Sequence, residues 1–318
     1  MKVLVTGGTG FIGNHVVRRL LGEGHTVRVL VRNAATAQSI KALGAEIVEG
    51  NLLQPASLHG AAAQQDAVVH TAAVVGSGRA VDAEYYQANV VGTQAILDEA
   101  KRAGAGRFVH LSTVGVYGLG ALRRGVTEDQ PVKPVGSAYV KTKAQAEAIV
   151  LAAGIPSVIL RPFWITGGGD RFLIPQVATL MRAGRFTLIG DGRQMWSISA
   201  VENVGDAAAL AAVHPNAPGH IYHVNDGEAP VADIMNEIAR GLHLPPITQR
   251  SALAAVVLKN TLVYRAAPRY TVDLLFGIWK DATFSTDRLR RDLGWQPRVP
   301  WRDSLRQGVI EWARTHPN

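Results

Sequence analysis

The sequence predicts an α/β protein with a doubly wound parallel sheet of about seven strands. Short apolar runs alternate with helical patterns through the first half of the chain, and a glycine-rich turn separates the first run from the first helix. Strands that are apolar on both faces and joined through helices indicate right-handed βαβ units. After residue 161 the alternation stops, so we expect a smaller, mostly helical C-terminal substrate lobe beside the sheet.

The spacing of apolar residues defines the expected elements. We expect strands at residues 2–6, 26–31, 45–48, 67–70, 107–112, 157–160 and 220–224, and helices at residues 13–23, 89–103 and 137–153. The expected organisation is a larger domain at residues 1–165 that returns at about 200–226, with the lobe built from residues 166–199 and 227–318.

The composition removes several classes of protein. None of the 318 residues is cysteine, which excludes a disulfide scaffold, a thiolate metal site and a cysteine nucleophile. The net charge of +8 does not identify a partner, and the basic run at residues 288–291 has the pattern of a solvated helix face, so we expect no nucleic-acid partner. His220 and His223 lack a third ligand at metal spacing, so we expect no metal site.

From the sequence we expect neither an export signal nor a membrane-spanning segment. The first residues do not resemble an export signal, and no apolar run is long enough to cross a membrane, so we expect a cytoplasmic protein. Residues 251–264 have the pattern of an amphipathic cap over an apolar substrate, which we favour, or of a helix that touches a membrane.

The turn after the first strand has the pattern of a phosphate-binding loop. Residues 6–13 read Thr-Gly-Gly-Thr-Gly-Phe-Ile-Gly. Gly7 permits a tight turn, Gly10 lets a pyrophosphate approach the backbone, and Gly13 permits close packing of helix on strand. The free N–H groups of the helix N-terminus then face the anion. This arrangement predicts a dinucleotide-binding Rossmann domain in which Thr9, Phe11 and Ile12 also line the cofactor.

The end of the second strand indicates which dinucleotide binds. An Asp or Glu there would accept a hydrogen bond from the ribose 2′-hydroxyl of NAD, but this strand ends in Val31-Arg32-Asn33. A guanidinium can pair with a 2′-phosphate and stack on adenine. We therefore expect Arg32 and Asn33 to contact NADP(H), with NAD(H) possible. The alternative is that Arg32 is only a solvated residue at a strand end.

Tyr139 and Lys143 form the most specific short pattern. Residues four apart lie on one face of a helix, and Ser137 is a plausible N-cap for it. A phenol with an ordinary pKa of about 10 exchanges protons poorly at neutral pH, and a nearby ammonium lowers that pKa. Ser112 and Thr113, where the fifth strand ends, could hold a substrate carbonyl. Adjacent strand residues point to opposite faces, so we expect one of these two hydroxyls to face the site.

Several motifs in this order resemble the extended short-chain dehydrogenase/reductase superfamily almost from end to end. They are the glycine turn, Asn51-Leu52, His70-Thr71-Ala72-Ala73, residues 89–93, residues 111–118, residues 139–143, Leu160-Arg161-Pro162 and residues 293–297. The resemblance implies that Tyr139 exchanges the proton, Lys143 binds the ribose hydroxyls and tunes Tyr139, Thr113 with Ser112 holds the carbonyl, and Asn89 supports a water-linked proton path. It also implies a homodimer and a cofactor wall that includes Asn51, Leu52, Thr71, Ala72, Ala73, Leu111, Pro162, Phe163 and Ile165.

Two branches of this superfamily compete. One contains 3β-hydroxysteroid dehydrogenases and dihydroflavonol-reductase-like enzymes, and the other contains nucleotide-sugar epimerases and dehydratases. This chain has Trp164 and Trp196 where the sugar enzymes typically have polar residues, and indoles favour an apolar substrate, which Val75 and Val114 would also contact. We expect direct hydride transfer between NADP(H) and an external carbonyl or alcohol. The alternatives are a nucleotide-sugar 4-epimerase or dehydratase with tightly held NAD(P), and a non-catalytic NADP(H)-binding scaffold.

Overall fold

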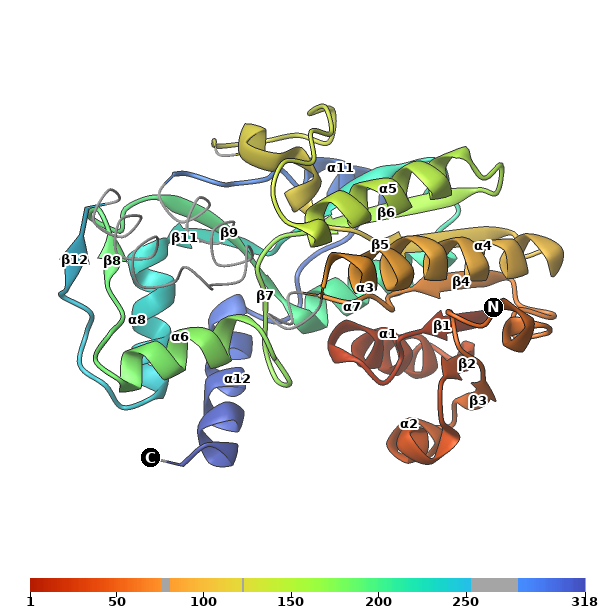
Figure 1. The fold of residues 1–318 in the computed structure, drawn as a ribbon, viewed down its shortest axis with the longest axis horizontal. Coiled ribbons are helices and arrows are strands. Elements are labelled where there is room, and N and C mark those ends of the chain that lie inside the picture. The colour runs from red at the N-terminus through yellow and green to blue at the C-terminus, as the bar shows by residue number, and fades with distance from the viewer. Residues whose placement is uncertain (76–80, 122, 253–279, 318) are drawn as a thin grey trace.

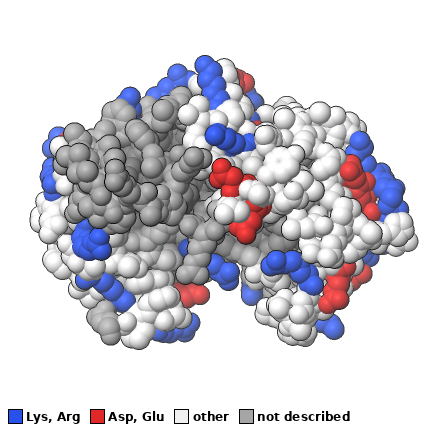
Figure 2. All heavy atoms as spheres, viewed as in Figure 1, with Lys and Arg blue, Asp and Glu red and all other residues white. Residues whose placement is uncertain are grey.

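The computed structural model describes residues 1–75, 81–121, 123–252 and 280–317 (Figure 1). From residue 253 onward, the cap expected at residues 251–264 lies outside the described residues. Within the described part of the chain, no helix is both long and apolar enough to cross a membrane. On the face drawn in Figure 2, Lys and Arg side chains are scattered over both halves of the molecule and do not gather into one patch.

Seven parallel strands form the main sheet, in the order β10-β6-β5-β4-β1-β2-β3. Their bounds are β1 (Lys2–Thr6), β2 (Thr26–Val31), β3 (Glu46–Glu49), β4 (Ala67–His70), β5 (Arg107–Leu111), β6 (Ser157–Pro162) and β10 (Ile221–Val224). Almost every residue of β1, β4, β5 and β6 is buried, as expected for a sheet covered on both faces. The predicted fold class is confirmed, including the seventh strand.

The order of the strands reverses between β1 and β4. The chain builds outward from β1 through β2 and β3, then returns to add β4, β5, β6 and β10 on the other side. Connections that leave the sheet on opposite faces open a crevice at the carboxyl ends of the strands on either side of such a point. Thr6 at the end of β1 is the register partner of His70 at the end of β4, so the glycine turn and the segment after His70 leave the same edge.

Helices cover both faces of this sheet (Figure 1). The four that cover it are α1 (Phe11–Gly22), α4 (Gly92–Arg102), α5 (Ala138–Ala152) and α7 (Val201–Val213). Apolar side chains of α1 and α7 share one core with Val5 and Val109, and those of α4 and α5 share a second core with Leu4 and Phe108. These side chains alternate along β1 and β5, because successive strand residues point to opposite faces.

Apart from α7, β10 and α11, the described chain after β6 forms a second group of elements, at the left of Figure 1. Two small sheets, β7-β9-β11 and β8-β12, lie there with helices around them. The bounds are β7 (Ile165–Thr166), α6 (Leu173–Arg182), β8 (Leu188–Ile189), β9 (Met195–Ala200), β11 (Gly227–Pro230), α8 (Val231–Gly241), β12 (Arg250–Ser251) and α12 (Trp301–Thr315). In contrast, α11 (Asp287–Leu293) packs on the main sheet, where Leu289 and Leu293 are buried in the core that α1 and α7 share with it. Trp196, Ile234 and Leu305 are fully buried in a core of their own.

The predicted elements differ from the structure mainly at their ends. The helix expected at residues 89–103 begins at residue 82 and contains a π-helical turn, because α3 (Asp82–Tyr86) and η3 (Gln87–Val91) precede α4. The strand expected at residues 45–48 is shifted by one residue, and the first helix begins at Phe11. Ser137 caps α5 as predicted, since its hydroxyl accepts a hydrogen bond from the Val140 N–H. The remaining short helices of the described residues are η1 (Ala34–Ala37), α2 (Gln38–Lys41), η2 (Pro55–Leu58) and η4 (Val114–Ala121).

Candidate active site

A cavity of about 1800 Å³ lies at the carboxyl ends of the strands of the main sheet, where the strand order reverses between β1 and β4. Its walls come from the glycine turn, the residues that follow β2, β4, β5 and β6, and helices α5 and α6. Since β2 and β6 are far apart in the sheet, the residues after them lie at opposite ends of the cavity. The cavity is therefore elongated across the sheet edge, which suits a dinucleotide with a second ligand beside it.

The glycine turn forms a cradle with little room for side chains. Gly7 has a φ of 73°, and its carbonyl accepts a hydrogen bond from the Gly10 N–H at 2.8 Å. A Cβ atom on Gly13 would lie 2.2 Å from the Gly7 oxygen, so only glycine fits there. No side chain caps the N-terminus of α1, which leaves its first N–H groups for a ligand. This cradle fits the pyrophosphate of a dinucleotide.

The end of the cavity near β2 is lined by polar side chains, two of which are held by hydrogen bonds from nearby backbone N–H groups. Arg32 is exposed on this wall and forms no salt bridge within the described part of the chain. The Asn33 side chain accepts a hydrogen bond from the Ala35 N–H at 2.8 Å, and the Asn51 side chain accepts one from the Leu53 N–H at 3.0 Å. Arg32 is thus the cationic side chain available at this end, with Thr36 beside it on the wall.

Asn89 holds the segment that follows β4 and does not itself line the cavity. Its side-chain oxygen accepts a hydrogen bond from the Val74 N–H at 2.8 Å, and its amide nitrogen donates to the Val74 carbonyl at 3.0 Å. The same nitrogen donates to the Thr142 hydroxyl at 3.2 Å, so Asn89 also reaches α5. Thr71 fixes the start of the segment by donating its hydroxyl hydrogen to the Thr6 carbonyl.

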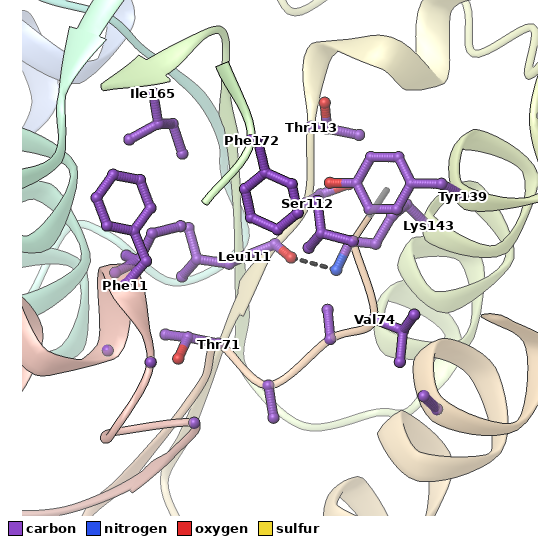
Figure 3. A pocket seen from close by; sticks show the side chains of 18 of the residues that line it. Phe11, Thr71, Val74, Leu111, Ser112, Thr113, Tyr139, Lys143, Ile165 and Phe172 are labelled. Carbon is purple, nitrogen blue, oxygen red and sulfur yellow. Dashed lines mark hydrogen bonds between the residues drawn. The ribbon is translucent and has the colours of Figure 1, made fainter. Parts of the chain in front are cut away.

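Lys143 reaches the cavity from α5 with an ammonium group that is deeply buried. Its Nζ donates to the Leu111 carbonyl, drawn as the dashed line in Figure 3, and lies 3.2 Å from Nε2 of His110. Burial lowers the pKa of Lys143 to about 8, and the charge of Glu147 opposes that shift. The lysine is therefore fixed at the end of β5 and titrates close to the physiological range.

Tyr139, Ser112 and Thr113 surround one region of the cavity (Figure 3). The Tyr139 ring packs edge-on against Tyr85 of α3, with ring centroids 6.5 Å apart, and its hydroxyl points into the cavity in Figure 3. The prediction that only one of Ser112 and Thr113 faces the site is wrong: both line it, because β5 ends at Leu111 and strand alternation stops there. The Ser112 hydroxyl is buried without a partner among the described residues, whereas Thr113 is only half-buried.

The end of the cavity near β6 is largely apolar. Phe163, Trp164, Phe172 and Phe284 line it. Trp164 has a φ of 33°, which is rare for a bulky residue and indicates backbone strain that the surrounding packing must compensate. Its ring lies against that of Trp196, with centroids 4.7 Å apart.

Trp196 itself stands behind this wall. It is 1% exposed, and its Nε1 donates to the Lys280 carbonyl at 3.2 Å. The indole therefore supports Trp164 and has no surface on the cavity.

Asp170 anchors the helix that carries part of the apolar wall. Its carboxylate accepts hydrogen bonds from the backbone N–H groups of Phe172, Leu173 and Ile174 at the start of α6. Burial nevertheless raises the pKa of Asp170 to about 6. The position of Phe172 in the cavity wall thus depends on a buried carboxyl group.

All the site residues expected from the sequence lie on the cavity wall except Asn89 and Trp196. The sequence contains no short motif that marks the wall contributed by α6, by the residue before Phe172 and by the segment after residue 280, where Arg171, Leu173, Gln176, Val177 and Ala282 lie. It also gave no signal for His110. These residues belong to no short motif, and only the folded chain brings them to the site. The described residues contain no group of three or more acidic or histidine side chains placed to hold a metal ion.

The fold and this cavity define a dinucleotide-binding enzyme. Residues 3–225 match the model of the NAD-dependent epimerase/dehydratase family, and the chain belongs to that family, within the extended short-chain dehydrogenases/reductases. It is an NAD(P)-dependent oxidoreductase of the class that acts on CH–OH and C=O groups.

Three relatives of known activity align with nearly the whole chain. A 4-hydroxy-2-methyl-3-oxo-4-farnesyl-3,4-dihydroquinoline-1-oxide ketoreductase of Stigmatella aurantiaca is 35% identical over 96% of both chains. A 2-alkyl-3-oxoalkanoate reductase of Stenotrophomonas maltophilia is 32% identical over 96% of this chain and 98% of the relative. A 3β-hydroxysteroid dehydrogenase/Δ5→4-isomerase of Mycobacterium tuberculosis is 31% identical over 96% of this chain and 88% of the relative.

Solved structures share the same architecture. The crystal structure of gox2253 has a TM-score of 0.81 at 27% identity and covers 99% of this chain and 98% of its own. A UDP-glucuronic acid 4-epimerase from Bacillus cereus with bound NAD has a TM-score of 0.77 at 22% identity, covering 99% of this chain and all of the epimerase. At that identity the epimerase shows the fold alone.

Proposed function

We propose that this protein reduces the ketone or aldehyde group of a largely apolar substrate with NADP(H), or oxidises the matching secondary alcohol. The observation that carries this proposal is the shared cavity: Tyr139, Lys143 and the hydroxyls after β5 line the same space as the glycine cradle and the aromatic wall. In this proposal residues 1–165 and 200–226 bind the dinucleotide, and residues 166–199 and 227–318 bind the substrate.

The chain's own residues supply the parts that a nicotinamide cofactor needs. The backbone N–H groups from Phe11 onward would hold the pyrophosphate, Lys143 the ribose hydroxyls, and Ile165 with Pro162 the carboxamide end. When bound, the nicotinamide gives hydride to a carbonyl carbon or takes it from an alcohol carbon.

Tyr139 moves the proton in this mechanism. Its hydroxyl donates a hydrogen bond to the substrate oxygen and gives up its proton as the C–O bond becomes an alcohol. The Lys143 ammonium stabilises the resulting phenolate, and its burial strengthens this electrostatic effect. Thr113, with Ser112 beside it, orients the same oxygen, since both residues line the cavity.

The aromatic wall supports an apolar substrate. Phe163, Trp164, Phe172 and Phe284 offer few hydrogen-bond partners for a sugar diphosphate and a large apolar surface for a hydrocarbon skeleton. The three named relatives include two reductases and a steroid dehydrogenase, which also favours this reading over the nucleotide-sugar alternative.

Arg32 supports a preference for NADP(H). It stands where the adenosine ribose would lie, without a salt bridge to the described residues, so its guanidinium can pair with a 2′-phosphate. Among the described residues, no carboxylate lines this end of the cavity to bind a free 2′-hydroxyl.

The proposal is tested by following NADPH oxidation with a panel of apolar ketones, β-keto acids and UDP-sugars. We expect turnover of apolar carbonyl compounds that falls at least about 100-fold in Tyr139→Phe. Tyr86→Phe is the matched control, because Tyr86 is an exposed tyrosine away from the cavity. Conversion of UDP-sugars without net NADPH oxidation, or full activity in Tyr139→Phe, would contradict the proposal.

A further inference from the structure

A row of polar side chains crosses the sheet on the side of α4 and α5. Thr6 and His70 end β1 and β4, and His110 is the last residue but one of the adjacent strand β5. The three residues are register partners, and each follows by two positions an apolar residue of the core on that face of the sheet. The Thr6 hydroxyl lies 2.6 Å from Nδ1 of His70, and the two imidazole rings are 5.5 Å apart. The row ends at Lys143, whose Nζ lies 3.2 Å from Nε2 of His110.

The hydrogen bonds around the two histidines define which nitrogen carries the hydrogen. The Thr93 hydroxyl donates to the Asn89 carbonyl at 2.7 Å, so toward Nε2 of His70 it can only accept. Nε2 of His70 is therefore protonated, and its Nδ1 accepts from Thr6. An ammonium has donors only, so Nε2 of His110 accepts from Lys143, and the single hydrogen of a neutral His110 sits on Nδ1.

Both imidazoles are neutral in this arrangement. Burial lowers the pKa of His70 to about 3, and burial with the nearby Lys143 charge holds the pKa of His110 far below its ordinary value. Nδ1 of His110 is buried without a partner within the described part of the chain. A buried donor left unpaired is costly, which indicates that the ring is kept there for what its other nitrogen does.

We propose that His110 is a positioning residue for Lys143, whose neutral Nε2 acts with the Leu111 carbonyl to hold the ammonium charged and fixed beneath the cavity. This inference rests on the proposed function, in which Lys143 acts on the ribose and on Tyr139. The ammonium has three hydrogens, and two are taken by these acceptors of β5. The third is left for the cavity side, where a ribose hydroxyl would accept it.

Among the titratable groups around Lys143, His110 is the one that favours the charged form of its ammonium by direct contact. The titratable groups near it in the described chain are His110 on β5, His70 on β4, and Tyr139 and Glu147 one turn away along α5. Glu147 is bound on both oxygens by Arg161, at 3.0 and 2.5 Å, and Arg161 offsets its charge. An acceptor in contact with an ammonium favours its charged form, and His110 is such an acceptor from the sheet side.

The test compares His110→Phe, which removes the acceptor, with His110→Gln, which can place an oxygen near the position of Nε2. His220→Phe is the matched control, because His220 is exposed and outside the cavity. In His110→Phe we expect kcat to fall about tenfold and the alkaline limb of the kcat profile to move about one unit lower in pH, with the carbonyl KM within about twofold. His110→Gln should restore most of kcat and the wild-type limb.

A purely structural role for His110 would lower the melting temperature in both variants and leave the alkaline limb in place, and that result would overturn the proposal. A readout that needs no turnover is the nitrogen-15 spectrum of histidine-labelled protein. We expect His110 to show the Nδ1–H tautomer and to change its shifts in Lys143→Met but not in Lys141→Met. If the wild type reduces no carbonyl compound while this signature is present, the proposed function is wrong, but the contact between Lys143 and His110 is confirmed. An unchanged His110 signal in Lys143→Met would instead refute that contact.

Discussion

The side chain of Asn89 binds both backbone polar groups of Val74, accepting from the N–H at 2.8 Å and donating to the carbonyl at 3.0 Å. Asn89 is completely buried and also contacts Thr142 on the helix that carries Tyr139 and Lys143. It therefore ties a wall of the cavity to α5. The water-linked proton path that the family resemblance implied for Asn89 stays a prediction, and this structural task stands beside it.

We predict that Asn89→Ala lowers both the stability of the protein and its affinity for the cofactor. The substitution leaves two backbone groups of Val74 without partners, so the free energy of unfolding should fall by about 2–4 kcal/mol. Cofactor binding, followed by NADPH fluorescence, should weaken by at least about tenfold because the segment from Thr71 to Val75 is released. Unchanged affinity with lowered stability would show that this segment does not shape the cofactor site.

Gly13→Ala should prevent dinucleotide binding. Its Cβ would lie 2.2 Å from the Gly7 oxygen, so α1 or the turn must move away. Gly22→Ala in the same helix is the matched control, because a Cβ there meets no atom within 4 Å. We expect Gly22→Ala to stabilise the protein by about 0.5–1 kcal/mol and to bind NADPH normally. Calorimetric titration with NADPH distinguishes the two, and normal binding by Gly13→Ala would contradict the cradle.

Arg32→Asp should reverse the cofactor preference. Loss of a charge-assisted pair with the 2′-phosphate should raise the KM for NADPH at least about tenfold, while the new carboxylate can accept from the 2′-hydroxyl and improve the use of NADH. Arg18→Ala, an exposed arginine of α1 outside the cavity, should leave both KM values unchanged. An unaltered NADPH/NADH ratio in Arg32→Asp would refute the assignment.

Trp164→Asn should narrow the range of substrates without unfolding the chain. Asn tolerates the positive φ at this position better than most residues, but it removes the indole that packs on Trp196. We expect kcat/KM to fall at least about tenfold for bulky apolar ketones and much less for small aldehydes. An equal loss for both groups would mean that Trp164 supports the fold and not the substrate.

Asp170 should make the protein less stable as the pH rises from about 4 to about 6. Because burial raises the pKa of Asp170 to about 6, the native state keeps a proton that the unfolded state loses above the ordinary value of 3.8. The free energy of unfolding therefore falls through this window as pH increases. Asp170→Asn keeps an acceptor oxygen for α6 and should gain stability relative to the wild type across it. Urea unfolding at a series of pH values checks this, and a difference that stays constant with pH contradicts it.

The main sheet could be predicted from the sequence because its strands are buried on both faces and read as continuous apolar runs. The apolar spacing predicts a helix start at residue 89 because residues 82–88, which form its first turns in the structure, are mostly polar or aromatic and show no apolar face. The family pattern predicts Trp196 in the substrate site, but the structure places it behind Trp164. The position of a residue in a sequence pattern does not indicate how deeply its side chain is buried. The α6 wall and His110 reach the site only through tertiary packing.

The most direct test of the central account uses NADPH that carries deuterium at both C4 positions of the nicotinamide, with an apolar ketone as substrate. Direct transfer to an external carbonyl predicts one deuterium on the carbinol carbon of each product molecule, one NADP⁺ released per turnover, and loss of both in Tyr139→Phe. A product without deuterium, or label that stays on the enzyme-bound cofactor while the substrate is only epimerised, would contradict the account.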